Sequence, residues 1–333
     1  MISSDLPFID LHRHLDGSIR LETIVDVGRQ YGLDLPGQTV EQLRPHVQVT
    51  EPQPGVMAFI AYFKWMTHIL VNYDICRRIA YENIEDAQIE GLDYVELRFS
   101  PLFMAETNDL NPAGVVEAVI DGVQAGVSDF GIGANLIGIL SRTYGPQTAW
   151  RELEALLPFR EHLVALDLAG DEANFPANMF TDHFLKAREA GLQITVHAGE
   201  AAGAVSVWSA IRDLGATRIG HGVQAIEDRA LLDFMCENQI GIEANLTSNV
   251  QTKTVADYES HPLRRFLALG LAATINTDDP GISGIDLPFE YEVAAPKAGL
   301  SAEHIRQAQQ NALSIAFLST SEKEELKSRA GEN

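Results

Sequence analysis

Short apolar runs alternate with longer polar stretches along the 333-residue chain. Eight of these runs have the length and composition of buried strands, and they lie at residues 8–12, 94–100, 134–140, 164–170, 194–199, 218–222, 240–246 and 272–279. From the second run onward, successive runs begin 22 to 40 residues apart, which leaves room for a crossover helix between each pair. Eight parallel strand–helix units predict an α/β fold of the closed (β/α)8 barrel type.

Helical periodicity fills the segments between the runs. Residues 20–33 place Ile24, Val27 and Tyr31 on one stripe, and residues 301–317 begin at a serine that suits an N-cap. No repeat and no long linker rich in Gly, Ser or Pro divides the chain, so we expect residues 1–333 to form a single barrel domain with extra helices at the C-terminus.

The connection between the first two strands is unusual. It is about 80 residues long, far more than a connection between a strand and the next helix needs. Within it, residues 55–70 are rich in large apolar side chains. We expect a helical insertion over roughly residues 17–93 that caps the barrel mouth, with Phe59, Ile60 and Phe63 facing a pocket. A helix that only packs against the barrel explains most of this segment equally well.

Composition narrows the class of protein. With 47 acidic and 24 basic residues, the formal net charge is −23, which repels polyanions and favours a neutral or cationic small substrate. Solubility alone also accounts for such a charge. The two cysteines, Cys76 and Cys236, are too few for a disulfide framework, and the N-terminus lacks a signal-peptide pattern. We therefore expect a cytoplasmic protein with neither a membrane nor a nucleic-acid partner.

Titratable residues follow four of the predicted strands. Side chains alternate across a strand, so His12 and His14 at the end of the first run share one face. The fifth, sixth and eighth runs end in 197-HAGE-200, 220-GHG-222 and 276-NTDDP-280. Functional groups of a barrel gather at the carboxyl ends of its strands. An isolated histidine pair is often structural, but recurrence at four corresponding ends predicts one shared site.

Three imidazoles and one carboxylate from these strand ends suit zinc. His12, His14, His197 and Asp278 form a nitrogen-rich donor set that leaves one coordination position for water. Bound zinc lowers the pKa of water from about 15.7 to about 7, which supplies a nucleophile at neutral pH. We therefore expect one Zn²⁺ per chain.

Three further residues complete the expected chemistry. Glu200 lies three residues beyond a predicted ligand, where apolar walls can raise the pKa of a carboxyl group and make it a general acid and base. We expect His221 and Asp279 to be catalytic as well, by hydrogen bonding the attacking oxygen and orienting it toward the substrate. Structural support of the metal ligands is the alternative role for both.

Taken together, the motifs resemble the adenosine/AMP deaminase family of the amidohydrolase superfamily. The motifs that carry the resemblance are 12-HRHLDGS-18, 94-YVELRFSP-101, 167-DLAGDE-172, 197-HAGE-200, 218-RIGHG-222, 246-LTSN-249 and 276-NTDDP-280. The resemblance covers essentially the whole chain. It implies a zinc-bearing barrel that hydrolyses adenosine and 2′-deoxyadenosine to inosine and 2′-deoxyinosine with release of ammonia, as in purine salvage.

The same resemblance implies substrate contacts. Gly170 offers its backbone N–H to purine N3, Asp279 contacts N7, Glu200 meets N1, and Asp16 holds the ribose 5′-hydroxyl. We also expect His14 to touch the substrate. The expected partners are thus a purine nucleoside and water.

Several alternatives stay open at this stage. Relatives that act on free adenine, AMP or modified nucleosides could share the metal ligands, although Asp16 would repel a 5′-phosphate. A barrel that binds nucleosides without hydrolysing them would be expected to have lost a ligand or Glu200, and the sequence retains them. Cysteine-ligated zinc deaminases are excluded, because the chain has no PCxxC motif.

Overall fold

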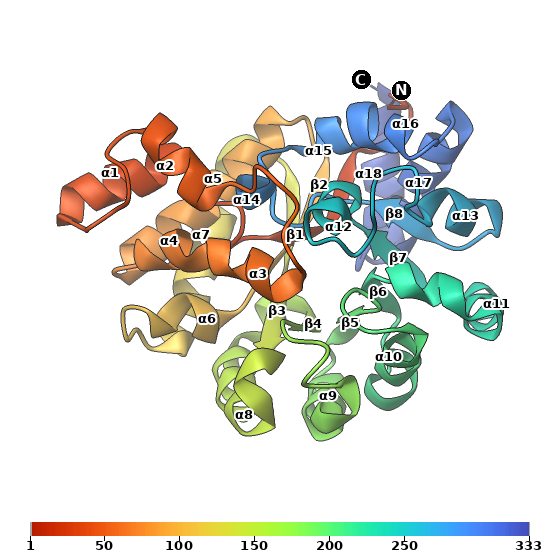
Figure 1. Cartoon of the computed structure of the whole chain (residues 1–333), viewed down its shortest axis with the longest axis horizontal. Helices are drawn as coiled ribbons and strands as arrows, with labels where there is room; N and C mark the ends of the chain where they lie inside the picture. The colour runs from red at the N-terminus through yellow and green to blue at the C-terminus, as the bar shows by residue number, and fades with distance from the viewer. Residues whose placement is uncertain (1, 333) are drawn as a thin grey trace.

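Eight parallel strands form the centre of the molecule, as expected. The computed structural model describes residues 2–332, without the side chain of Glu332. The strands are β1 (Ile9–His14), β2 (Tyr94–Phe99), β3 (Gly133–Ser141), β4 (Leu163–Ala169), β5 (Gln193–Ala198), β6 (Arg218–His221), β7 (Gly241–Ala244) and β8 (Ala273–Ile275). They follow one another around the sheet in chain order, and helices surround them (Figure 1). The prediction of a (β/α)8 barrel is confirmed.

The barrel closes between its first and last strands. The backbone N–H of His14 donates to the carbonyl of Asp278 over 2.7 Å, and the N–H of Asp278 donates to the carbonyl of His12 over 2.8 Å. Closer to the start of β1, the N–H of Leu11 donates to the side-chain oxygen of Asn276 over 3.0 Å. The backbones of three predicted metal ligands, His12, His14 and Asp278, therefore take part in closing the barrel.

Helices form the outer layer. Those beside the strands are α5 (Tyr73–Ile89), α7 (Pro112–Phe130), α8 (Gly145–Leu156), α9 (Thr181–Glu189), α10 (Ala204–Ser209), α11 (Arg229–Glu237), α13 (Leu263–Ala268), α17 (Ala302–Ile315) and α18 (Thr320–Glu332). Shorter α-helices are α6 (Pro101–Glu106), α12 (Leu246–Gln251), α14 (Pro280–Ser283), α15 (Leu287–Phe289) and α16 (Ala295–Lys297). The 3-10 turns are η2 (Arg142–Tyr144), η3 (Leu157–His162), η4 (Ala177–Phe180) and η6 (Val223–Glu227), and the π-helical turns are η5 (Ala210–Leu214) and η7 (Glu290–Ala294). Within residues 2–332, none of these helices has the length and apolar character needed to cross a membrane.

Local sequence signals set the ends of two helices. Ser301 caps α17, because its hydroxyl accepts the backbone N–H of His304 while the His304 ring accepts the N–H of Ser301. The extra helix of the insertion, α1 (Leu21–Tyr31), stops at Gly32, whose φ of 64° is left-handed. Both helices lie where the periodicity predicts them.

The insertion between β1 and β2 is helical. Besides α1 and α5 it contains α2 (Val40–Val47), α3 (Val56–Ile60), the 3-10 turn η1 (Ala61–Phe63) and α4 (Lys64–His68). In Figure 1, α3 lies near the centre of the view, in front of the strands. Phe59 and Phe63 are buried there, so this part of the insertion carries apolar side chains to the barrel mouth.

The two faces of β1 differ in character. Ile9 and Leu11 point outward into a cluster with Ala312, Ala316 and Leu326 of the C-terminal segment. The alternate residue His12 points inward and is fully buried. Alternation along one strand therefore separates the apolar packing from the chemistry, as the sequence pattern requires.

Candidate active site

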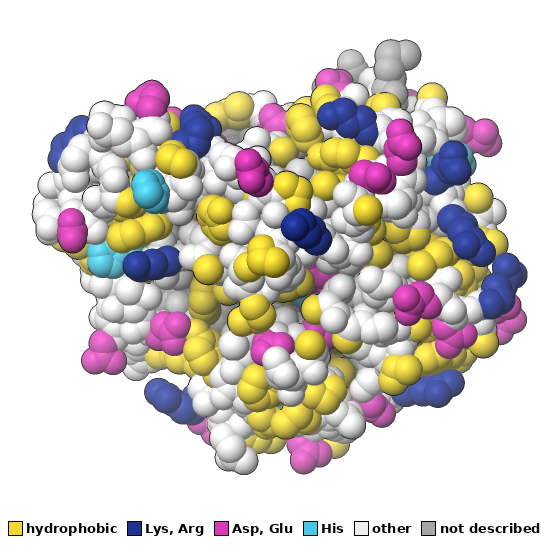
Figure 2. Space-filling model, viewed as in Figure 1, with side chains coloured by type: hydrophobic (Ala, Val, Ile, Leu, Met, Phe, Trp, Pro, Cys, Tyr) yellow, Lys and Arg dark blue, Asp and Glu magenta, His cyan; other side chains and the backbone are white. Residues whose placement is uncertain are grey.

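A cavity opens at the carboxyl ends of the strands. Its volume of about 310 Å³ is at the lower end of the roughly 300–1,000 Å³ typical of small-molecule sites. Figure 2 shows a hollow near the centre of this face, bordered by hydrophobic and acidic side chains. The predicted site residues that line the cavity are His14, Asp16, Phe59, Ile60, Phe63, Gly170, His197, Glu200, His221, Asp278 and Asp279. Of the predicted site residues, only His12 lies deeper, beneath this lining.

The four predicted metal ligands converge on one point. The Nε2 atom of His197 lies 3.1 Å from Nε2 of His12 and 3.1 Å from Nε2 of His14. Asp278 Oδ1 lies 3.1 Å from His12 Nε2 and 3.4 Å from His14 Nε2. With Zn–N distances of about 2.0–2.1 Å, tetrahedral donors lie roughly 3.3 Å apart, so these separations suit a small cation at their centre.

Buried carboxylates fix the tautomers of two of these histidines. His12 Nδ1 lies 2.7 Å from Glu243 Oε2, and His197 Nδ1 lies 2.9 Å from Asp167 Oδ2. A carboxylate accepts a hydrogen bond, so each Nδ1 carries the proton and each Nε2 keeps its lone pair. This is the arrangement that a metal-binding imidazole needs.

His221 lies beside the ligands but is bonded differently. Its donor atoms group with those of His12, His197 and Asp278 within 4.8 Å, while His14 groups with Asp278 and Asp279. Its Nδ1, however, lies 2.9 Å from the side-chain amide of Asn249, and its Nε2 is 3.8 Å from Asp278 Oδ2. Proximity alone would make His221 a ligand, but its hydrogen bonding favours a donor at Nε2.

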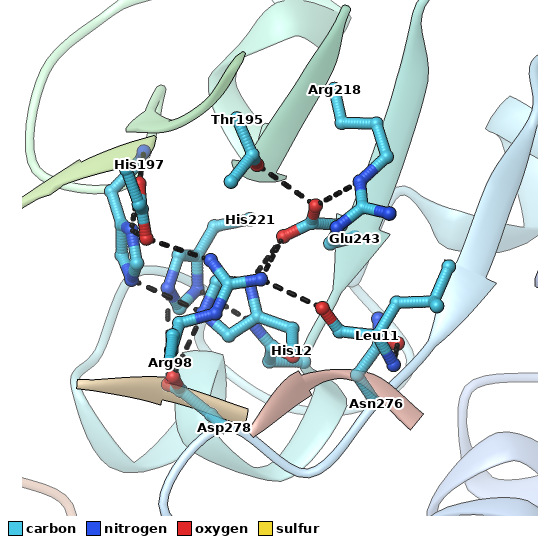
Figure 3. Close-up of polar contacts among 12 residues, drawn as sticks. Leu11, His12, Arg98, Thr195, His197, Arg218, His221, Glu243, Asn276 and Asp278 are labelled. Atoms are coloured by element: carbon cyan, nitrogen blue, oxygen red, sulfur yellow. Dashed lines mark hydrogen bonds and ion pairs between the residues drawn. The ribbon is translucent and has the colours of Figure 1, made fainter. Parts of the chain in front are cut away.

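An ionic network fills the barrel beneath these residues. Figure 3 shows Glu243 between two arginines, and its carboxylate accepts from Arg98 over 2.7 Å and from Arg218 over 2.6 Å. Arg98 also pairs with Asp167 over 2.8 Å, and Arg218 pairs with Glu96 over 2.5 Å. All five side chains are buried, and the two arginines hold the pKa of Glu243 well below its usual range despite burial.

The charges of this region favour a divalent cation. Four carboxylates, those of Glu96, Asp167, Glu243 and Asp278, lie around the donor atoms and the two paired guanidinium groups. The pKa of His14 points the same way: burial opposes a positive charge, but the surrounding aspartates outweigh it and raise the pKa to about 9. Donor geometry and charge therefore both fit a metal ion such as zinc.

Glu200 has the environment of a carboxyl group that keeps its proton. Burial, and then the charges of Asp278, Glu172 and Asp279, raise its pKa well above the usual range. It lines the cavity, and its Oε1 lies 3.6 Å from His221 Nδ1. The site thus joins a metal-binding donor set to a protonated acid.

Comparison with known proteins identifies the family. The family model for adenosine deaminase matches residues 7–332. The chain belongs to the adenosine deaminase family. The adenosine deaminase of Salmonella typhimurium strain LT2 is 58% identical to it over 332 residues and covers 100% of both chains.

Solved structures share the fold of this adenosine deaminase family member. The adenine deaminase of Arthrobacter aurescens superimposes with a TM-score of 0.90 at 24% identity, covering 98% of both chains. An amidohydrolase of Burkholderia ambifaria with bound Zn has a TM-score of 0.88 at 24% identity, covering 99% of this chain and 90% of that one. The fold is thus also that of amidohydrolases.

The structure adds a residue to which sequence reasoning assigned no role. Glu172, which is 4% exposed, accepts the backbone N–H groups of four consecutive residues, Gly199 to Ala202, over 2.6 to 3.1 Å. The clamped loop includes Glu200, so Glu172 fixes the backbone that carries the acid. An acidic residue just after a buried strand, in 167-DLAGDE-172, was the available signal, but its partners are backbone atoms that no side-chain pattern reveals.

Sequence reasoning also missed the ionic network. Asp167 and Glu243 occupy the middle of buried strands, 164-VALDLAG-170 and 240-IGIEANL-246. A charged residue inside an otherwise apolar strand is rare unless it is paired, and this was the signal that could have found both. In this member of the adenosine deaminase family, each of the two carboxylates pairs with a histidine of the site and with Arg98, and Glu243 also pairs with Arg218.

Two buried carboxylates present unpaired oxygens. Within residues 2–332, Oδ1 of Asp16 and Oδ1 of Asp279 have no hydrogen-bond partner, and both residues line the cavity. Burial, and then the charge of Asp278, raise the pKa of Asp279 well above its usual range. A buried polar atom without a partner is costly, so these atoms are suited to contact a ligand.

The remaining predicted residues form the cavity wall. Gly170 has a φ of 111°, and a Cβ there would collide with the Thr143 hydroxyl, so only glycine suits the position. Across the cavity, Phe59, Ile60 and Phe63 form the apolar side, and the Phe63 ring packs edge-on against Phe103 at 5.5 Å between centroids.

Proposed function

We propose that this protein hydrolyses adenosine and 2′-deoxyadenosine to inosine and 2′-deoxyinosine with release of ammonia. The observation that carries the proposal is the meeting, at one cavity, of three imidazoles and a carboxylate with Glu200, a buried glutamic acid whose pKa is raised. Membership of the adenosine deaminase family supports the same reaction.

In this proposal, His12, His14, His197 and Asp278 hold one zinc ion per chain. Bound zinc would supply a Lewis acid that activates water at neutral pH. Glu243 and Asp167 orient two of the imidazoles through their Nδ1 protons. The protein thus presents His12 and His197 already in the tautomers that metal binding requires.

Glu200 delivers the proton that makes the purine reactive. Burial and the charge of Asp278 raise the pKa of Glu200, which favours the protonated side chain that can donate to N1 of the ring. Protonation of N1 withdraws electrons from C6, where water adds. The adding water supplies both protons that the reaction consumes: one restores Glu200 after its donation to N1, and the other reaches the amino group through the same carboxyl group, so that ammonia departs and C6 is left as a carbonyl.

The neighbouring groups orient the substrate. His221 donates from Nε2 to the oxygen that attacks C6. Asp279, whose pKa burial and the charge of Asp278 raise, donates in its protonated form to the N7 acceptor of the purine while its other oxygen faces the attacking water. Gly170 donates its backbone N–H to N3, and Asp16, beside His14, accepts the ribose 5′-hydroxyl.

The apolar side of the cavity excludes water from the reacting atoms. Phe59, Ile60 and Phe63 cover the nucleoside, which strengthens the electrostatic contacts beneath it. The acidic residues Asp16 and Glu106, which both line the cavity, disfavour a 5′-phosphate by repulsion. A nucleoside is therefore preferred over AMP.

A rate comparison together with elemental analysis tests the proposal. The purified protein should carry about one zinc per chain and should convert adenosine and 2′-deoxyadenosine, followed by ultraviolet absorbance and by ammonia release. Free adenine and AMP should react at least about 10²-fold more slowly in kcat/KM, because they lack or repel the ribose contact. Faster turnover of adenine or AMP than of adenosine would overturn the substrate assignment.

A further inference from the structure

A chain of buried side chains runs from His221 away from the cavity. The His221 Nδ1 atom lies 2.9 Å from Nδ2 of Asn249, and Asn249 Oδ1 lies 3.1 Å from Nε2 of His261. The other ring nitrogen of His261, Nδ1, lies 3.1 Å from the backbone nitrogen of Leu263. The side chains of His221, Asn249 and His261 are at most 3% exposed, so the chain is closed to bulk water.

The direction of every hydrogen bond in this series of side chains follows from the bond at its far end, between Leu263 and His261. A backbone N–H can only donate, so His261 Nδ1 accepts from Leu263 and its proton lies on Nε2. His261 therefore donates to Asn249, which fixes the oxygen of that amide toward His261 and its NH₂ group toward His221. His221 Nδ1 must then accept, and the proton of its neutral ring lies on Nε2.

Other groups near His221 do not reverse this order. Asn245 also presents its amide nitrogen to Nδ1, at 3.3 Å, and Glu200 Oε1 stands 3.6 Å away, beyond hydrogen-bonding distance. Burial lowers the pKa of His261 to about 3, so its ring is neutral and Nδ1 keeps the lone pair that the chain requires.

The arrangement behind His221 is opposite to that behind the metal-binding histidines. Carboxylates behind His12 and His197 place the proton on Nδ1 and leave a lone pair on Nε2. An amide NH₂ group behind His221 places the proton on Nε2 instead. Three adjacent imidazoles are thereby divided between ligand and hydrogen-bond donor by what lies behind each ring.

We propose that Asn249 and His261 are positioning residues that hold His221 in the Nε2–H tautomer. In this tautomer His221 donates from Nε2 toward the oxygen that attacks the substrate. Its Nε2 then has no lone pair with which to compete for the metal. The role of the donor rests on the proposed function, whereas the tautomer itself is a property of the protein that can be measured without substrate.

Nitrogen NMR of the zinc-loaded protein tests the tautomer directly. With ¹⁵N-labelled histidine, two-bond proton–nitrogen correlations distinguish a protonated ring nitrogen from one with a lone pair, and comparison with His221→Asn assigns the signals. We expect His221 to carry its proton on Nε2 and His261 to do the same. A proton on Nδ1 of His221 in the wild-type protein would overturn the proposal, whatever the activity.

Reversing the hydrogen bond between Asn249 and His221 gives the corresponding kinetic test. In Asn249→Asp both oxygens accept, so His261 keeps its bond while His221 must turn its proton to Nδ1. Loss of one preorganised donor should lower kcat by about 10²-fold with KM within about threefold of wild type. The NMR signal of His221 should change tautomer in the same variant, and an unchanged tautomer would contradict the proposal.

Variants of His261 separate positioning from packing. Glutamine can accept from Leu263 and donate to Asn249, so His261→Gln should keep the Nε2–H tautomer and a kcat within about threefold of wild type. Leucine can do neither, and His261→Leu should lower kcat by about 10 to 100-fold. Equal losses in both variants, with the tautomer unchanged, would show that His261 only packs.

A matched control is available elsewhere in the barrel. His183 is also buried, and its ring stacks on Trp150 at 4.0 Å between centroids while Nε2 meets the carbonyl of Pro146. His183→Leu should cost stability without changing the His221 tautomer or the ratio of kcat to KM. If adenosine is not the substrate, the kinetic tests fail together, but the NMR tests still decide the tautomer.

Discussion

The barrel floor and the cap meet at the same cavity but are built on different principles. The floor consists of charged side chains held by directional bonds, such as Glu243 between Arg98 and Arg218. The cap side consists of Phe59, Ile60 and Phe63 and makes mainly apolar contacts. Hydrogen bonds fix atoms to within tenths of an ångström, whereas apolar contacts tolerate rearrangement. The floor should therefore control catalysis and metal content, and the cap should control affinity.

The strongest test of this division removes a metal ligand from the floor. His14→Ala should strip most of the zinc and lower kcat by about 10³-fold or more, because the metal supplies several kcal/mol of transition-state stabilisation. Elemental analysis and the ultraviolet assay measure both effects. The exposed His46→Ala is the matched control and should leave both unchanged. Full zinc occupancy in His14→Ala would remove His14 from the metal site.

Replacement of the acid separates chemistry from metal binding. Glu200→Gln keeps the shape of the side chain but cannot deliver a proton, so kcat should fall by about 10² to 10⁴-fold. Zinc content and nucleoside affinity should stay close to wild type, since Glu200 is not a ligand in the proposed site. A kcat within about tenfold of wild type would refute the assigned role. Loss of zinc would instead move Glu200 into the coordination sphere.

Removal of one arginine tests the floor as a folding element. Arg218→Met leaves Glu96 and Glu243 buried without their cation, and breaking a buried pair in this way costs about 3–5 kcal/mol. The free energy of unfolding, measured with denaturant, should fall by that amount. Arg212→Met, at an exposed arginine that lies over the Trp208 ring, serves as the control and should have a much smaller effect. Equal effects would show that the network adds no special stability.

Weakening the contact of Glu172 with the loop that carries Glu200 should have an intermediate effect. Glu172→Gln puts an NH₂ group against backbone donors, so the loop that carries Glu200 loosens and kcat should fall by about 10 to 100-fold. The Glu172 charge also helps to raise the pKa of Glu200. Without that charge the pKa of Glu200 falls, so activity that requires the protonated acid should be lost at a lower pH. Glu189→Gln is the exposed control. A pH–activity profile of Glu172→Gln that matches that of the wild type would contradict this expectation.

The cap should give the smallest effect. Phe63→Ala removes part of the apolar cover, and KM should rise by about tenfold while zinc content stays unchanged. Met57→Ala in the adjoining helix α3 is a control, because Met57 is 45% exposed. If truncation of Phe59, Ile60 and Phe63 each left the kinetics unchanged, this part of the insertion would have only a packing role.

The sequence predicts what depends on local pattern. Alternation in β1 places His12 and His14 on one face, and short apolar runs locate all eight strands. The eighth run is longer than its strand, because β8 ends at Ile275 and Asp278 adopts a left-handed φ of 64°. A side chain that leaves its strand in this way can turn toward the histidines of β1, which the period of a strand alone would not indicate.

What the sequence leaves undetermined depends on register between distant strands. Glu243 meets Arg98 and His12 only because β7, β2 and β1 reach the same level inside the barrel. The hydrogen bonds behind His221 require Asn249 of α12 to meet His261, which lies in the connection before α13. Each of these residues can be recognised as polar and out of place from the sequence, but its partner cannot be named without the fold.

Closure of the barrel has a consequence for synthesis of the chain. Leu11 and Asn276, which bond across the closing strands, are 265 residues apart. At about 5–20 residues per second, a ribosome needs roughly 13 to 53 s to make the segment between them. Throughout that interval β1 is an unpaired strand edge on its β8 side, and Asp278, the last of the proposed metal ligands, is still to be translated. The proposed ligand set is therefore complete only after translation has passed β8.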